Sequence, residues 1–111
     1  MTKIQKYCVF HPEMKTYRQA DYCRRCYDRH RKWKDRGMID MTTKRYYEML
    51  KSQDGKCLFC DRQPREDRFF DTDHDHKTGR VRGLLCNEHN RAVGVVEKNI
   101  DLLPKFLEYI R

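Results

Sequence analysis

Four short-spaced pairs of metal-binding side chains constrain this chain more than any other feature. The pairs are Cys8 with His11, Cys23 with Cys26, Cys57 with Cys60, and Cys86 with His89. Two residues separate the members of each pair, a spacing that lets both side chains reach one tetrahedral ion. We therefore predict two structural zinc (Zn²⁺) sites, each with three thiolates and one imidazole. The alternative is buried cysteines without metal, but two such quartets would account for all six cysteines.

The composition leaves little apolar surface for a large core. The chain has 111 residues, of which 38% are hydrophobic and 38% are charged, and its mean hydropathy is −1.08. A chain of this length forms one compact unit or two very small ones. Metal binding is a common compensation for a small core.

The charge balance predicts a polyanionic partner. The net charge is +8 and the pI is about 9.3, which favours polyanions, chiefly nucleic acid. No amphipathic segment with a strong apolar face supports membrane binding, and no long apolar run is present. The first residues, Met1 to Lys6, are polar and do not resemble a signal peptide, so we expect an intracellular protein with reduced thiols.

Residues 1–38 are predicted to form an N-terminal zinc ribbon or knuckle with a basic helix. The helix should run from about Cys23 to Arg36 and end at Gly37. A solvated charged face is the alternative reading of such a helix. The neighbouring zinc pair favours nucleic-acid contact instead. The predicted contacts on this helix are Arg24, Arg25, Arg29, Arg31, Lys32 and Lys34.

Residues 39–111 are predicted to form a second unit. Thr42 or Thr43 can cap a helix that runs to about Ser52, with Tyr46, Met49 and Leu50 as its packing face. A hairpin should follow, starting at Phe69-Phe70, turning at Gly79, and continuing through 81–85. A helix over 87–97 comes next.

The last segment is expected to be a helix capped by Asp101. The apolar residues of this helix are Leu102, Leu103, Phe106, Leu107 and Ile110. Helical spacing of this kind most often marks a packing face. It is also compatible with contact to a second protomer, so a homodimer is an additional expectation.

Three short sequence motifs resemble those of a known family. They are Gly55 to Cys60, Asp73-His74-Asp75-His76, and Gly79 to Asn90. Together they resemble the phage recombination endonuclease VII family of HNH, or His-Me finger, nucleases, over roughly residues 43–110. The resemblance implies a small α+β fold in which a zinc-stabilised ββα-metal core carries the nuclease site. It also implies a protein of the infected host cell's cytoplasm if a phage encodes it.

The Asp-His run and Asn90 are the predicted catalytic residues. His74 is the candidate general base, because a neutral imidazole can take a proton from water near pH 7. By the resemblance, Asp73 and Asn90 bind a catalytic ion, and such oxygen ligands suit Mg²⁺ or Mn²⁺. Neighbours on a strand point to opposite faces, so Asp73 and His74 can meet one phosphate only if the chain bends there. His76 is expected on the same strand face as His74, and it either contacts the scissile phosphate, positions the base, or is a surface residue.

Arg80 and Arg82 alternate along the second strand and are predicted phosphate contacts, with solvent exposure as the alternative. Two departures from the family pattern are visible. His89 stands where the family usually has cysteine, and Val93 stands where some members have an acidic residue near the ion. The second departure leaves a third protein ligand of the ion open.

Two other function classes remain open at this stage. A non-catalytic zinc-ribbon protein that binds nucleic acid would explain the charge and both zinc sites, but not Asp73, His74 and Asn90. A zinc-stabilised adaptor for an acidic protein explains less. Within the nuclease reading, the DNA substrate is open between branched junctions, specific duplex sites and nicking.

Overall fold

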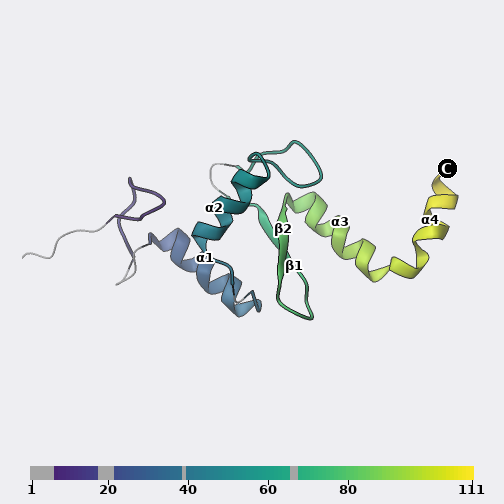
Figure 1. Cartoon of the computed structure of the whole chain (residues 1–111), viewed down its shortest axis with the longest axis horizontal. Coiled ribbons are helices and arrows are strands. Elements are labelled where there is room, and N and C mark those ends of the chain that lie inside the picture. The colour runs from purple at the N-terminus through teal and green to yellow at the C-terminus, as the bar shows by residue number, and fades with distance from the viewer. Residues whose placement is uncertain (1–6, 18–21, 39, 66–67) are drawn as a thin grey trace, which may run out of the picture.

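The computed structural model describes residues 7–17, 22–38, 40–65 and 68–111. A β-hairpin lies between two helices that precede it in the chain and a helical arm that follows it (Figure 1). The elements are α1 (Arg24–Asp35), α2 (Thr43–Ser52), β1 (Asp71–His74), β2 (Val81–Leu85), α3 (Asn87–Lys98), the 3-10 helix η1 (Ile100–Leu102) and α4 (Leu103–Ile110). The predicted small α+β class is therefore confirmed.

Both predicted N-terminal helices are present, and their ends follow local signals. Helix α1 ends at Asp35, and Gly37 then takes a φ of +83°, a left-handed conformation that favours glycine. Of the two predicted caps for α2, Thr42 is the one used. Its side chain accepts a hydrogen bond from the Arg45 N–H at 3.1 Å.

Tyr46 organises the main core. Its ring stacks on Phe69 with 4.3 Å between centroids, and its hydroxyl accepts the Phe70 N–H at 2.8 Å. The predicted packing face of α2 is confirmed, since Tyr46 is buried and Met49 and Leu50 pack against the same core. Phe69 and Phe70 anchor the hairpin as expected, although β1 itself begins one residue later at Asp71.

The hairpin contains an irregularity at the Asp-His run. Asp73 pairs with Gly83, whereas His74 pairs with Val81, so Arg82 is the extra residue of a β-bulge. The bulge bends β2 and increases the local twist of the hairpin opposite Asp73 and His74. The turn closes at Gly79, whose φ of +75° confirms the predicted left-handed position.

The C-terminal arm differs from expectation in two ways. Asp101 does not cap the last helix: it lies within η1, and α4 starts after Leu102 with a proline in its first turn. The predicted packing face is also wrong for a single chain, since Phe106 and Leu107 are 46% and 54% exposed. Helix α3, η1 and α4 contain no buried residue and project away from the core (Figure 1). No helix in the described ranges is long and apolar enough to cross a membrane.

Packing crosses the predicted boundary between residues 38 and 39. Trp33 and Met38 belong to the same core as Tyr46 and Phe69. His30 on α1 accepts the backbone N–H of Thr43, the first residue of α2, at 2.9 Å. The division into 1–38 and 39–111 stays a prediction, but α1 is part of the support of the hairpin.

The hairpin turn is held against the end of α1, and this contact can be tested. A Cβ at position 79 would collide with the Gly37 carbonyl oxygen and would also sit on a positive-φ backbone. We expect Gly79→Ala to lower the free energy of unfolding by at least about 2 kcal/mol. Gly94→Ala is the matched control, because a Cβ there meets nothing within 4 Å in α3. It should stabilise the protein by about 0.5–1 kcal/mol. Equal effects in denaturant unfolding would contradict the proposed turn contact.

Candidate functional site

The first predicted zinc quartet converges in space. The Cys8 and Cys26 sulfurs lie 3.9 Å apart, and His11 Nδ1 lies 3.3–3.8 Å from the sulfurs of Cys8, Cys23 and Cys26. Tetrahedral zinc with ordinary bond lengths separates its ligands by roughly 3.6–3.8 Å. The ligand atoms therefore fit one zinc ion, and the cluster could hold it.

The second quartet has the same arrangement. The Cys60 and Cys86 sulfurs lie 3.9 Å apart, and His89 Nδ1 lies 3.7 Å from Cys57 and 3.2 Å from Cys86. His89 thus occupies a ligand position with a suitable nitrogen, although the resembled family usually has cysteine there. This cluster joins the 57–60 turn to the end of β2 and the first turn of α3.

The thiols in each cluster are electrostatically interdependent. Burial raises the pKa of the Cys26 thiol to about 12, and the neighbouring Cys23 and Cys8 add to this effect. For Cys8, burial also acts to raise the pKa, but hydrogen bonds from backbone groups and His11 outweigh it and lower the pKa to about 6. Three thiolates this close repel one another, and a bound cation relieves that repulsion.

Tyr47 links the first cluster to α2. His11 turns Nδ1 toward the sulfurs, and its other ring nitrogen, Nε2, lies 3.1 Å from the Tyr47 hydroxyl. A second hydrogen bond of this kind orients a metal-binding imidazole. Burial raises the pKa of Tyr47 to about 12, so the hydroxyl stays protonated near neutral pH. The N-terminal cluster is therefore connected to the main fold by a side chain that the sequence reasoning did not single out.

An open pocket of about 390 Å³ collects the predicted catalytic residues. We call it the histidine pocket, and its lining residues are Arg36, Met38, Thr72, Asp73, His74, His76 and Asn90. They come from the end of α1, from the hairpin and from the first turn of α3. All four residues predicted to act in catalysis thus line one cavity.

The two histidines lie together although only one is on a strand. The ring centroids of His74 and His76 are 4.6 Å apart. The expectation that both share one strand face needs correction, because β1 ends at His74 and His76 lies in the turn. Asn90 donates its side-chain N–H to Asp71 at 3.3 Å, which attaches the first turn of α3 to the start of β1.

Asp73 is engaged by an arginine in this structure. Arg82 donates to both carboxylate oxygens of Asp73, at 2.8 and 3.0 Å, and also to Glu97 on α3. The hydrogen bonds to Asp73, and to a smaller extent the one to Glu97, raise the pKa of Arg82, so its guanidinium stays positively charged. Arg82 was predicted to contact phosphate, but here its guanidinium bridges two carboxylates.

The histidine pocket contains residues that the sequence reasoning missed. Arg36 and Met38 lie just after the end of α1, about 35 residues before the Asp-His run, and no local pattern connects them to it. Within the described part of the chain, the Thr72 hydroxyl is the one buried side-chain oxygen or nitrogen without a hydrogen-bond partner. Such a group at a pocket wall is a candidate to bind a ligand or water. Glu97 was also missed, since it is one turn beyond Val93 and the family pattern does not mark it.

The predicted nucleic-acid contacts of α1 differ in exposure. Arg24, Arg25, Arg31, Lys32 and Lys34 are exposed, as is Arg80 on the hairpin turn. Arg24 also approaches Asp28 at 3.8 Å, an exposed pair that contributes little to stability. Arg29 is different: its guanidinium stacks over the Phe69 ring at 5.2 Å, and burial lowers its pKa. Arg29 therefore contributes to packing in this structure, and its assignment as a phosphate contact stays a prediction.

Comparison with known proteins identifies the class. The family model of recombination endonuclease VII matches residues 29–111, and the chain belongs to this family. The match begins within α1, earlier than the start near residue 43 that the sequence motifs suggested.

Two phage proteins are among the relatives. The Gene 59 protein of Mycobacterium phage D29 is 36% identical over 72 residues, which are 64% of this chain and 44% of that protein. The Gene 59 protein of Mycobacterium phage L5 is 35% identical over 71 residues, which are 63% of this chain and 43% of that protein. The matched regions therefore span less than half of either relative.

Two zinc ions per chain are expected, one in each cluster. Elemental analysis of the purified protein should give two equivalents, and Cys86→Ser or Cys23→Ser should each remove about one. Chelation should unfold the protein cooperatively, because binding free energy is also folding free energy in so small a core. His89→Cys is the control, since it keeps four zinc ligands and should retain both ions. A content of one ion or none in the unaltered chain would reject the two-site prediction.

Proposed function

We propose that the chain is a metal-dependent DNA endonuclease of the HNH, ββα-metal type. The observation that carries the proposal is the histidine pocket, which gathers Asp73, His74 and Asn90 from the hairpin and the first turn of α3. Family membership supports the same chemistry. The net charge of +8 supports a DNA substrate.

His74 is proposed as the general base. Its ring takes a proton from the attacking water, and it lines the same pocket as the proposed oxygen ligands, Asp73 and Asn90. His76, whose ring is a neighbour of His74, is proposed to contact the scissile phosphate or to orient the base. Both proposed roles are filled by residues that line the histidine pocket.

Asp73 and Asn90 are proposed to hold one Mg²⁺ or Mn²⁺ ion. Their carboxylate and amide oxygens fit a hard cation that keeps several water ligands. When bound, such an ion stabilises the charge on the transition state and the departing 3′ oxygen. Val93 cannot supply a carboxylate, and it packs partly buried against the core, so water would complete the coordination.

The engagement of Asp73 by Arg82 favours a second candidate function. With both oxygens occupied, the same fold could serve as a zinc-stabilised module that binds nucleic acid without cutting it. In the nuclease proposal, Asp73 receives an ion only after Arg82 gives up at least one oxygen. Glu97 would then still bind the Arg82 guanidinium.

The proposal has three further parts. They are DNA as the substrate, a homodimer formed through the exposed apolar arm, and phosphate contacts made by Arg80 and α1.

His74→Ala should reduce plasmid cleavage in Mg²⁺ by about 10²- to 10⁴-fold, because base removal affects the attack of water. DNA affinity and thermal stability should stay nearly unchanged. Asp73→Ala and Asn90→Ala should also lose cleavage, but raised Mn²⁺ should partly restore them. Plasmid, linear duplex and a four-way junction should each be offered to the unaltered protein. Full cleavage by His74→Ala would point to another base, and rescue of this variant by Mn²⁺ alone would contradict the base assignment. No cleavage of any of the three substrates by the unaltered protein would favour the non-catalytic alternative.

The competition at Asp73 gives a separate test by metal binding alone. Arg82→Gln should tighten Mn²⁺ binding to the zinc-loaded protein roughly 2- to 5-fold, since a partly exposed ion pair contributes up to about 1 kcal/mol. Electron paramagnetic resonance can count free Mn²⁺ directly. Arg80→Gln is the matched control, with the same charge change two residues away in the hairpin. An equal gain in both variants would show a general charge effect and not competition for Asp73.

A further inference from the structure

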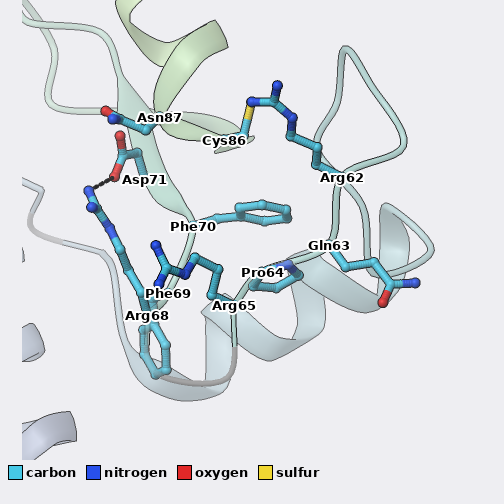
Figure 2. A pocket seen from close by; sticks show the side chains of 10 residues that line it. All are labelled: Arg62, Gln63, Pro64, Arg65, Arg68, Phe69, Phe70, Asp71, Cys86 and Asn87. Carbon is cyan, nitrogen blue, oxygen red and sulfur yellow. Dashed lines mark hydrogen bonds and ion pairs between the residues drawn. The ribbon is translucent and has the colours of Figure 1, made fainter.

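A second pocket lies at the start of β1, and none of its arginines has a role in the function proposed above. It is an open hollow of about 210 Å³ whose walls include Arg62, Arg65, Arg68, Phe70, Asp71 and Asn87. Figure 2 shows the three arginine side chains around the Phe70 ring. We call this hollow the arginine pocket.

We propose that the arginine pocket binds a backbone phosphate of the DNA strand that enters the histidine pocket. The inference rests on the proposed nuclease function and adds the path of the substrate strand. A phosphate diester is the ligand class indicated, because guanidinium groups donate paired N–H bonds to phosphate oxygens.

The charge of the pocket favours an anion. Its lining holds three arginines against one aspartate and the Cys86 sulfur, whose charge as a thiolate a zinc ion in the cluster would offset, so these side chains carry a net positive charge. Arg68 donates to Asp71 at 3.4 Å, and Arg62 pairs with Glu88 at 2.7 Å outside the lining. Both arginines remain more than half exposed in these pairs, and such pairs contribute little free energy. A guanidinium has five N–H donors, so Arg62 and Arg68 can also reach a phosphate.

The position of the pocket connects it to the histidine pocket. Asp71 lines the arginine pocket and accepts a hydrogen bond from Asn90, which lines the histidine pocket. From Asp71 to His74 the strand advances three residues, or about 10 Å. A stacked DNA strand carries one phosphate per roughly 3.4 Å of helix axis. The arginine pocket is therefore within reach of a phosphate one to three nucleotides from the scissile one.

The Phe70 ring gives this pocket an apolar wall beside its cations. Phe70 is only 6% exposed, and its N–H is bound by the Tyr46 hydroxyl, so its position is set by the core. Rigid placement of this kind keeps the arginine pocket at a constant distance from Asn90. The arginine pocket would therefore position the DNA strand and would take no part in the cleavage reaction itself.

The first test measures DNA binding in zinc-containing buffer without Mg²⁺ or Mn²⁺, so that no cleavage is needed. The variant is Arg65→Ala with Arg68→Ala, and the control is Lys105→Ala with Arg111→Ala, which removes the same charge from the distant end of the arm. Log affinity falls with log salt, and loss of one phosphate contact should make this slope less steep by about 0.9. It should also weaken binding about fivefold at 0.15 M salt. An equal effect in the control pair, or no change in slope, would overturn the proposal.

The second test uses cleavage to fix the register. A duplex whose linkages are randomly replaced by neutral methylphosphonates is cut by the unaltered protein in Mg²⁺, and the cut products are sequenced for excluded positions. We expect a sensitive linkage one to three nucleotides from the cut, and the Arg65/Arg68 double variant should lose that sensitivity while retaining sensitivity at the cut itself. Persistence of the outlying sensitivity in the variant would overturn the inference. An absence of any cleavage would count against the proposed function, while the binding test would still decide the pocket.

Discussion

The convergence of Cys57, Cys60, Cys86 and His89 is the constraint on which the geometry of the histidine pocket depends. Helix α3 has no buried residue, and Val93 packs only partly buried against the core, so hydrophobic packing holds this helix weakly. Its first turn carries both His89, a member of the cluster, and Asn90, a proposed ligand of the catalytic ion. A metal ion in the cluster would therefore place Asn90 by fixing its neighbour.

Two polar contacts complete the placement of α3. Near its start, Asn90 donates to Asp71, and near its end Glu97 accepts from Arg82. Both partners are on the hairpin, which is itself anchored by Tyr46 through Phe69 and Phe70. The helix is thus attached at two points along one side, while its apolar residues Val95 and Val96 stay exposed. Loss of the cluster would leave the partial packing of Val93 and surface hydrogen bonds, which are individually weak.

The sequence was informative where chemistry depends on spacing between near neighbours. The cysteine pairs, the Thr42 cap and the left-handed Gly79 all rest on local geometry, and the structure agrees with each. It was less informative where the outcome depends on distant contacts. Arg36 reaches the histidine pocket because α1 packs against the hairpin turn, and a one-dimensional pattern does not contain that contact. The apolar stripe of α4 predicted a packing face, but no surface of the same chain covers it in the described structure.

The bulge opposite Asp73 and His74 determines what Arg82 can contact. In a regular ladder Arg82 would have a direct partner on β1. The extra residue instead leaves Arg82 without a ladder partner, and its guanidinium bonds both carboxylate oxygens of Asp73. The irregularity therefore places a cation on the candidate metal ligand, which lines the histidine pocket together with His74. An arginine and a divalent ion have the same charge sign, so Asp73 is neutralised in either state. The bulge thus gives the half-buried Asp73 carboxylate a cationic partner before any ion arrives.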